Sequence, residues 1–207
     1  MSVPTPGKIV CVGRNYAAHA RELGNALPER PLIFLKPPSA VIGSGDVILL
    51  PAISSRVEFE GEIGLVIGRR LRRATERDAA DAIAGICPVN DVTARDLQQL
   101  DGQWARAKGC DTFCPVGPVA PLTVPLDAIE IVTRLNGGIR QRATSAEMIF
   151  AIPELLAYIS AFMTLEPGDL ILTGTPEGVG PLSPGDRVEV EIPGVGLLHN
   201  PVARANE

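Results

Sequence analysis

Three glutamates alternate along one short segment of the chain. Glu58, Glu60 and Glu62 occupy every second position between Val57 and Ile67. In a β-strand their side chains would share one face, spaced roughly 6.5–7 Å apart along the strand. The apolar residues fall on the other face and continue as an uninterrupted run, which is typical of a buried strand rather than a solvated one. Because a protein interior tolerates a row of carboxylates only when protons or a cation neutralise it, the pattern favours a cation site.

A second acidic segment lies downstream, between Pro88 and Asp96. One carboxylate from this segment, combined with two from the glutamate strand, would form a donor set made only of oxygen. Mg²⁺ and Mn²⁺ prefer such ligands and leave the remaining positions to water or substrate. The strand pattern by itself does not decide which of the three glutamates takes part.

The composition excludes several classes of protein. The 207 residues suit one domain, residues 1–207, because no linker marks a second one. A net charge of −5 argues against nucleic-acid binding, and the 21 Gly and 19 Pro favour short strands and tight turns. No Cys-x-x-Cys pair suggests zinc, and Cys11 and Cys87 are expected to be buried free thiols. With no export signal or membrane span, these thiols predict a cytoplasmic protein.

Periodicity and turn residues predict mostly strands. Strands are expected over 8–12, 32–36, 57–67, 169–172, 186–192 and 197–202, with a β-hairpin over 129–142 around Asn136-Gly137. Helices are expected over 16–23, 75–84 and 153–162, and residues 104–118 are expected to be irregular. Asn15 is the predicted N-cap of the first helix and Thr75 that of the second.

Polar residues near the predicted strand ends are candidates for chemistry. His19 and Glu22 are three residues apart and would share one helix face, either as an incidental exposed pair or as part of a site. Lys36 and Lys108 could each face solvent or a pocket, and spacing does not choose between these. The glycine-rich segment 174–180 lacks the Gly-Lys-Ser/Thr ending of a phosphate-binding loop. It is therefore interpreted as a turn close to a small ligand, with Thr175 as a hydroxyl donor.

Taken in order, these stretches resemble the fumarylacetoacetate hydrolase family. The resemblance rests on seven stretches: Gly13-Arg14-Asn15-Tyr16 with His19 and Glu22, Phe34-Leu35-Lys36-Pro37, Glu60-Gly61-Glu62, Asn90-Asp91-Val92-Thr93-Ala94-Arg95-Asp96, Lys108-Gly109 with the segment 111–118, Met148-Ile149-Phe150, and Leu172-Thr173-Gly174-Thr175-Pro176. It implies an α+β, mostly β fold, in which a mixed, multi-layer β-sheet roll carries a few short helices. The chain is similar to the short, single-domain branch of the family.

The resemblance also implies roles for residues. It assigns Mg²⁺ or Mn²⁺ to Glu60, Glu62 and Asp91, and leaves Glu58 outside the metal site. It implies catalytic roles for His19, Glu22 and Lys108. The residues implied to contact the substrate are Arg14, Tyr16, Lys36, Arg95, Gln98 and Thr175. The stretch 141–148 departs in detail from the commoner pattern, which bears on side-chain specificity rather than on the metal site.

The implied activity is metal-dependent C–C bond hydrolysis of acylpyruvate-type 2,4-dioxo acids, with oxaloacetate decarboxylation as a further activity. An alternative is isomerisation of 2-hydroxydiene acids of aromatic degradation. An alternative of another class is a non-catalytic metal-binding protein, which would leave His19, Glu22 and the two lysines unexplained. The implied partners are a small 2-oxo acid and a second copy of the chain in a homodimer, with neither nucleic acid nor membrane.

Overall fold

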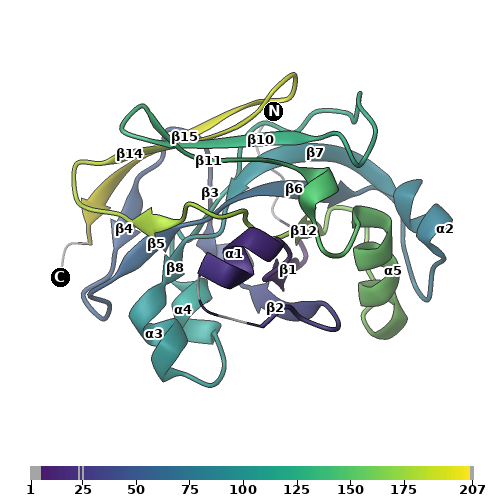
Figure 1. Ribbon diagram of the computed structural model, residues 1–207, viewed down its shortest axis with the longest axis horizontal. Helices are drawn as coiled ribbons and strands as arrows, with labels where there is room; N and C mark the ends of the chain where they lie inside the picture. The colour runs from purple at the N-terminus through teal and green to yellow at the C-terminus, as the bar shows by residue number, and fades with distance from the viewer. Residues whose placement is uncertain (1–5, 23, 25, 206–207) are drawn as a thin grey trace.

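The computed structural model describes residues 6–22, 24 and 26–205, and within them the chain is mostly β. Four sheets and a few short helices form the layers shown in Figure 1. This confirms the predicted fold class. The predicted end of the first helix, at residue 23, lies outside the described residues.

The first sheet is the central one and carries the amino-terminal strand. Across it the strands follow in the order β2 (Leu32–Lys36), β1 (Ile9–Gly13), β12 (Leu170–Leu172), β6 (Gly61–Ile67) and β7 (Ile83–Asn90). Only the β1–β12 pair is parallel. Successive residues of β1 enter different cores, since Val10 packs in one hydrophobic cluster and Cys11 in another. Burial on both faces explains why this strand is an uninterrupted apolar run.

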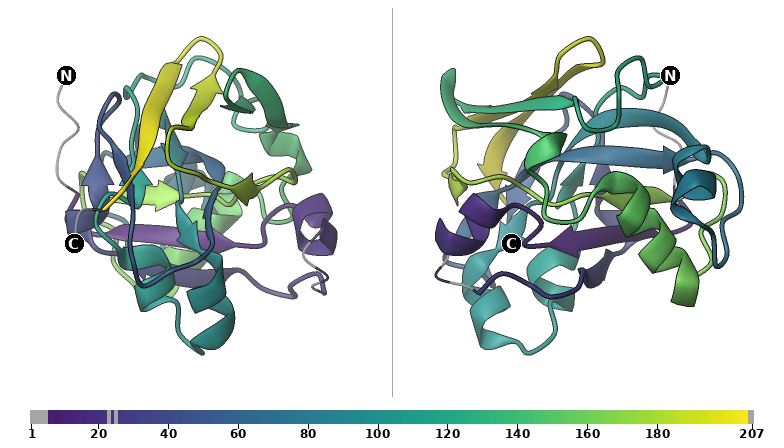
Figure 2. Two further views of the ribbon diagram at one scale, coloured as in Figure 1. Left: turned by 90° about the vertical axis from the view of Figure 1, so that its left-hand side faces the viewer. Right: turned by 45° about the vertical axis from the view of Figure 1, so that its right-hand side comes forward.

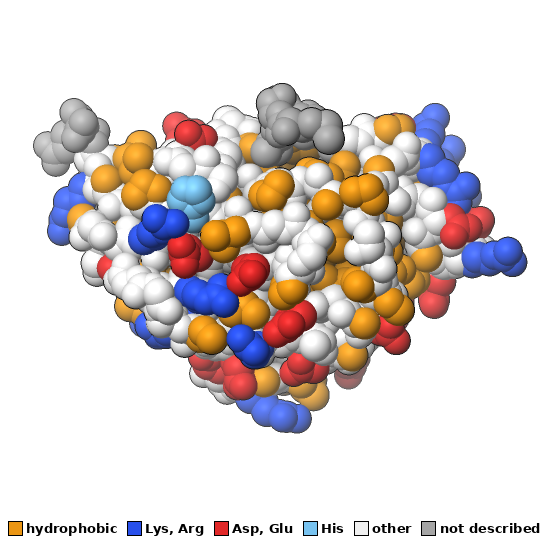
Figure 3. Space-filling model, turned by 90° about the horizontal axis from the view of Figure 1, so that it is seen from above, with side chains coloured by type: hydrophobic (Ala, Val, Ile, Leu, Met, Phe, Trp, Pro, Cys, Tyr) orange, Lys and Arg blue, Asp and Glu red, His pale blue; other side chains and the backbone are white. Residues whose placement is uncertain are grey.

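The second sheet lies across the first and covers one of its faces (Figures 1 and 2). Its strands follow in the order β11 (Gly138–Thr144), β10 (Glu130–Leu135), β14 (Arg187–Ile192), β15 (Gly196–Arg204) and β4 (Ile48–Leu50). The predicted hairpin is confirmed as β10 and β11. Its turn residues Asn136 and Gly137 have φ of 53° and 80°, the left-handed values that a two-residue hairpin turn requires. On the face seen from above in Figure 3, acidic and basic side chains lie interspersed.

Two small sheets complete the β-structure and interrupt the predicted glutamate strand. They consist of β13 (Gly180–Pro181), β5 (Val57–Phe59) and β8 (Thr93–Ala94), and of β3 (Val41–Ile42) and β9 (Cys114–Pro115). The predicted strand 57–67 is therefore two strands, β5 and β6, in different sheets. Glu60 is the residue between them. Both sets of side chains in this segment are buried, because Phe59 and Ile63 are fully enclosed and Glu58, Glu60 and Glu62 are at most 5% exposed.

The helices are short and lie at the edges of the sheets. They are α1 (Ala17–Glu22), α2 (Glu76–Ala80), α3 (Arg95–Leu100), α4 (Ala105–Gly109) and α5 (Ile152–Phe162), with single 3₁₀ turns at Pro38–Ala40 and Ser145–Glu147. In Figure 1, α2 and α5 pack together at the right, while α3 and α4 lie at the lower left. None of the helices in the described part of the chain is long and apolar enough to cross a membrane.

Three local predictions were wrong. The helix expected over 75–84 ends at Ala80, because the following residues pair with β6 in the central sheet, and sheet pairing outweighs the helix propensity of alanine. Residues within 104–118 form α4, whose Lys108 is buried. Asn15 does not cap α1 with its side chain. Instead, its amide donates to the carbonyl oxygens of Phe150 and Thr173 and accepts from the Phe150 N–H.

Candidate active site

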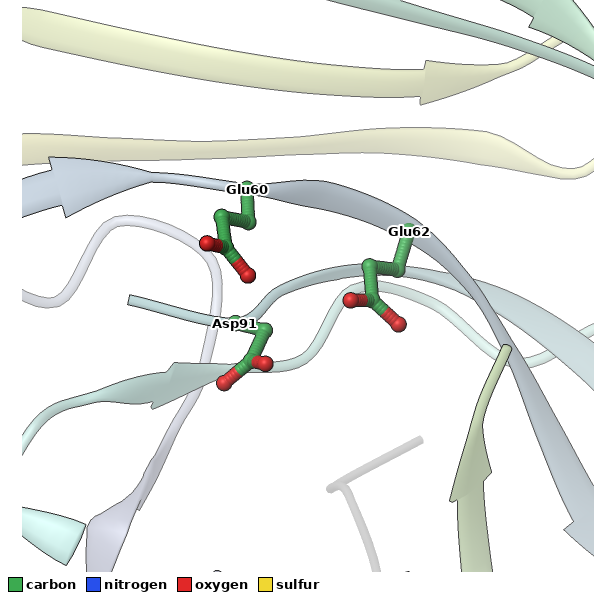
Figure 4. Close-up of side chains that lie close together, drawn as sticks. All are labelled: Glu60, Glu62 and Asp91. Atoms are coloured by element: carbon green, nitrogen blue, oxygen red, sulfur yellow. The ribbon is translucent and has the colours of Figure 1, made fainter. Parts of the chain in front are cut away.

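Three buried carboxylates converge at the end of the central sheet. Glu60 is the residue between β5 and β6, Glu62 lies in β6, and Asp91 directly follows β7. Figure 4 shows the three side chains pointing into one space. Each offers one oxygen, and these oxygens lie within 4.8 Å of one another. This is closer than the spacing of roughly 6.5–7 Å expected along a regular strand.

The break in the strand explains how the carboxylates come together. At Glu60 the chain leaves the sheet of β5 and enters that of β6, so its backbone makes bonds outside the regular ladder. The Glu60 N–H donates to Oδ1 of Asn90 at 3.0 Å. The Glu60 carbonyl oxygen accepts from the Asp91 N–H at 2.8 Å. These two bonds tie the glutamate segment to the end of β7 and hold Asp91 opposite Glu60.

Cationic side chains from α3 and α4 bind two of the three carboxylates. Lys108 Nζ donates to Glu60 at 2.8 Å and to Asp91 at 2.5 Å. Arg95 donates to the other oxygen of Glu60 at 2.5 Å and to Glu58 at 2.7 Å. Burial by itself would raise the pKa of Glu60, but Lys108 and Arg95 lower it below its usual value. Glu60 is therefore ionised at neutral pH.

Glu62 differs because no cationic side chain of the described residues lies within ion-pair distance of it. It is 2% exposed, and its carboxylate accepts a 2.7 Å bond from the Gly174 N–H. Burial raises the pKa of Glu62 well above its usual value, and Asp91 and Glu60 raise it further. An uncompensated carboxylate beside two others is what a divalent cation would neutralise. The donor set of three carboxylates therefore fits Mg²⁺ or Mn²⁺.

The His19–Glu22 pair predicted from spacing is formed on α1. The two side chains meet at 3.2 Å between Nδ1 and the Glu22 carboxylate, which can only accept, so Nδ1 carries the proton. Glu22 also accepts from the backbone N–H of Gly178 at 3.0 Å. His19 is 4% exposed and contributes to the same cavity as the three carboxylates. Its Nε2 is therefore free to accept a proton from a molecule bound there.

The carboxylates, His19 and several predicted contacts line one cavity of about 240 Å³. Phe34 and Trp104 supply its apolar wall and pack edge to face, with ring centroids 5.2 Å apart. The predicted site residues that line it are Arg14, His19, Glu60, Glu62, Asp91, Arg95, Gln98, Lys108 and Thr175. The cavity thus brings together three carboxylates, a buried histidine and cationic side chains, a lining that suits a small, anionic ligand.

Three predicted residues lie outside this lining. Lys36 is completely enclosed and donates to Asp91 at 2.7 Å and to the Val92 carbonyl oxygen at 3.1 Å. Tyr16 lines a separate cavity beside α1, and its hydroxyl has no partner among the described residues. Glu22 does not line the cavity itself and is connected to it by its hydrogen bond to His19. Glu58 is 1% exposed and binds Arg56 and Arg95, in keeping with its predicted place outside the metal set.

Gln141 was missed by the sequence reasoning. It is 2% exposed, and its Oε1 accepts from the Gly61 N–H at 3.0 Å. Its Nε2 donates to Thr175 Oγ1 and to the Pro176 carbonyl oxygen, both at 2.8 Å. Thr175 in turn donates to the Gly61 carbonyl oxygen at 2.9 Å, which closes a ring of hydrogen bonds behind the carboxylates. The sequence did contain a signal for Gln141. Alternate residues of a strand face opposite sides of a sheet, and in β11 the neutral Gln141 lies between the charged Arg140 and Arg142 and points inward.

Comparison with known proteins covers nearly the whole chain. The family model described as fumarylacetoacetate (FAA) hydrolase C-terminal matches residues 8–203. Among curated relatives, the mitochondrial oxaloacetate tautomerase FAHD1 of Arabidopsis thaliana is 45% identical over 203 residues, which cover 95% of this chain and 91% of the relative. The mitochondrial oxaloacetate decarboxylase of Dictyostelium discoideum is 44% identical over 199 residues, which cover 92% of this chain and 91% of the relative.

Solved structures agree with the sequence comparison. The 5-carboxymethyl-2-hydroxymuconate delta-isomerase from Mycobacterium smegmatis matches with a TM-score of 0.91 and 48% identity, over 98% of this chain and 81% of that one. The fumarylpyruvate hydrolase from Pseudomonas aeruginosa, in complex with Mn²⁺ and pyruvate, matches with a TM-score of 0.91 and 32% identity, over 97% of this chain and 91% of that one. These similar proteins thus share one fold, but they are named after different reactions.

Proposed function

The chain belongs to the fumarylacetoacetate hydrolase family, and from this premise we propose that it is a divalent-metal-dependent enzyme acting on small 2-oxo acids. The proposed substrates carry a second carbonyl group next to C3, as acylpyruvates and oxaloacetate do. The observation that carries this proposal is the convergence of the Glu60–Glu62–Asp91 carboxylates and the His19–Glu22 pair on one cavity.

Glu60, Glu62 and Asp91 are the proposed ligands of Mg²⁺ or Mn²⁺. When bound, the ion would supply Lewis-acid chemistry, because a divalent cation stabilises negative charge on a nearby oxygen atom. The protein's own contribution is to hold these carboxylates in place through Lys36, Lys108 and Arg95, and to keep bulk water away from them. The Mn²⁺ named in the fumarylpyruvate hydrolase complex supports this assignment.

His19 is the proposed general base. Glu22 fixes the proton on Nδ1 and stabilises the imidazolium that forms when Nε2 takes a proton. In hydrolysis, that proton comes from the water that attacks the distal carbonyl group. In tautomerisation, it comes from C3 or the enol hydroxyl of the substrate. Lys108 Nζ lies on the same cavity and stabilises negative charge on the bound acid.

Hydrolysis of acylpyruvate-type 2,4-dioxo acids is the first candidate reaction, because an imidazole that Glu22 orients through Nδ1 is suited to activating water at Nε2. Tautomerisation or decarboxylation of oxaloacetate is the second. It is favoured by the names of two relatives that are 44–45% identical to the chain, whereas the similar hydrolase is 32% identical. Isomerisation of a 2-hydroxydiene acid is supported by the name of a structure at 48% identity.

A substrate panel tests this proposal. Acetylpyruvate, oxaloacetate and a 2-hydroxydiene diacid are each assayed with Mg²⁺, with Mn²⁺ and with excess EDTA. Oxaloacetate is followed both by its enol absorbance and by pyruvate release, which separates tautomerisation from decarboxylation. We expect at least one metal-dependent turnover that EDTA abolishes. Metal binding by calorimetry without any turnover would instead favour a non-catalytic metal-binding protein.

A further inference from the structure

A backbone N–H outside the cavity lining is bonded to the His19–Glu22 pair. The Gly178 N–H donates to both oxygens of the Glu22 carboxylate, at 3.0 and 3.2 Å. The second of these oxygens, Oε2, is also the one that lies 3.2 Å from Nδ1 of His19. Of the α1 side chains that the structure describes, only that of Glu22 is hydrogen-bonded to another segment. The Gly178 N–H is therefore the group outside α1 that fixes the Glu22 carboxylate.

The packing at Gly178 leaves no room for a side chain. Its φ is 97°, in the left-handed region that favours glycine. A Cβ atom at this position would lie 2.0 Å from the carbonyl oxygen of Arg140. That oxygen belongs to the backbone of β11, which cannot move aside as the end of a flexible side chain could. Because Gly178 has no side chain, its segment lies directly against β11, and this contact sets the direction of the N–H.

The segment that carries this N–H also holds a carboxylate of the proposed metal site. Four residues earlier, the Gly174 N–H donates to Glu62 at 2.7 Å. Between the two glycines, Thr175 and Pro176 are hydrogen-bonded to residues of β6 and β11. Residues 174–178 are thus held along their length by the two sheets. They fix the proposed metal site and the proposed base relative to each other.

We propose that Gly178 is a positioning residue for the His19–Glu22 pair. Its N–H holds the Glu22 carboxylate opposite Nδ1 of His19, which keeps the proton on Nδ1 and leaves Nε2 as the acceptor. This inference rests on the proposed function and adds to it a residue that acts on the base through Glu22. Its contribution comes from the main chain, so it depends on the absence of a side chain.

The tautomer of His19 tests the inference without turnover. Nitrogen-15 NMR distinguishes a protonated from an unprotonated imidazole nitrogen, and His199→Gln identifies the signals of His19, because the chain has only two histidines. For the neutral ring we expect the Nδ1–H tautomer in the parent and a mixture with the Nε2–H tautomer in Gly178→Ala. Gly185→Ala is the matched control: its φ of 93° imposes similar backbone strain, but no described atom lies within 4 Å of its Cβ. An unchanged tautomer in Gly178→Ala would overturn the inference.

Two further measurements separate positioning from a general disturbance of the fold. By calorimetry, Gly178→Ala should keep nearly the parent's Kd for Mn²⁺, because Glu62 has its own backbone donor. A large loss of Mn²⁺ affinity together with the tautomer would refute the specific role. Glu22→Asp is one methylene shorter and cannot reach Gly178 and His19 at once, so it should give the same mixture with no change in the backbone. A retained Nδ1–H tautomer in this variant would also contradict the proposal.

Kinetics connect the position of the pair to the reaction. In the substrate panel, Gly178→Ala should lower kcat roughly 10- to 100-fold and leave KM nearly unchanged, because a small misplacement of a catalytic group can have an effect of this size. An unchanged kcat would contradict the proposal. A changed tautomer in a protein that turns over no member of the panel would leave the positioning role of Gly178 standing and reject the proposed function.

Discussion

Glu60 and Asp91 are joined twice, through the main chain and through a shared lysine. The Asp91 N–H donates to the Glu60 carbonyl oxygen at 2.8 Å, and Lys108 Nζ donates to both carboxylates. The burial of these groups is tolerated because each negative charge has a cationic partner. Glu62 has only a backbone partner within the described residues, and it is therefore the ligand whose replacement tests the cation site most directly.

Replacing Glu62 by Ala should abolish stabilisation by Mg²⁺ or Mn²⁺. A ligand that binds only the folded state at about 100 times its Kd adds about 2.7 kcal/mol, which raises the Tm of the parent by several degrees. Differential scanning fluorimetry with and without the ion measures this shift. Glu58→Gln is the matched control, a buried glutamate of the same segment that should keep the shift. A full metal-dependent shift in Glu62→Ala would refute the assignment.

Replacing His19 by Ala should separate the candidate reactions. Acylpyruvate hydrolysis should fall about 10²–10⁴-fold, the usual loss for a general base. Oxaloacetate decarboxylation needs no attacking water and should fall much less, while binding of Mn²⁺ should stay intact. Glu22→Gln should act in the same direction. The measurement is the ratio of the two activities in each variant against the parent, and an equal loss of both would assign His19 to binding or to protonation of the enolate.

Replacing Gln141 by Glu should weaken the hydrogen bonds that hold the segment from Glu60 to Glu62 in place, without changing any side chain that lines the cavity. The variant cannot donate to Thr175 and the Pro176 carbonyl oxygen, and two lost bonds at a buried site cost about 1–3 kcal/mol each. We expect a lower Tm and a higher Kd for Mn²⁺ by calorimetry. Gln103→Glu, at an exposed position, is the control. A lower Tm with unchanged Mn²⁺ affinity would limit Gln141 to a structural role.

Asp96 should make the fold sensitive to acid. Burial raises the pKa of Asp96, but the hydrogen bonds that its carboxylate accepts from Ser54, Ser55 and Leu97 together lower it to about 2. Because the folded pKa lies below the unfolded value of about 3.9, this stability is present above pH 4 and is lost as the pH falls toward 2. With solvent screening the contribution is on the order of 1 kcal/mol. Asp96→Asn should lower Tm at pH 7 and flatten its decline between pH 4 and 2. Identical pH profiles would contradict this.

The expected homodimer follows from the family resemblance. At micromolar concentration, light scattering or sedimentation should give twice the chain mass of 21.9 kDa. A monomer over the whole concentration range would contradict it. The measurement should be repeated with EDTA, because the proposed cation site lies within one chain and its loss should leave the assembly unchanged.

Local patterns were sufficient for much of the fold. The Asn136-Gly137 turn and the periodic apolar run of α5 depend on neighbours in sequence, and the structure confirms them. The motifs also led to the correct family. The predictions that failed concerned residues whose partners are distant in the sequence. Asn15 is hydrogen-bonded to Phe150, and the residues after Ala80 pair with β6.

The motifs named candidate residues that the structure places around one cavity, but they did not predict the network that joins these residues. Spacing cannot show that Lys36 lies behind Asp91, or that Gln141 reaches Thr175 from the hairpin, because these pairs are brought together by the packing of separate sheets. For the same reason it could not show that Glu60 stands at a break between two strands.

The break between β5 and β6 at Glu60 has a consequence for how the protein unfolds. Phe59 packs in one hydrophobic cluster with parts of α3 and α4, and Ile63 packs in another between the large sheets. Phe59 and Ile63 therefore stand on opposite sides of a boundary between two packing units, and Glu60 and Glu62 lie in the segment between them. An ion held by both would act as a reversible cross-link, so that one unit could open alone only by releasing it. The cofactor would then set the cooperativity of unfolding as well as the chemistry.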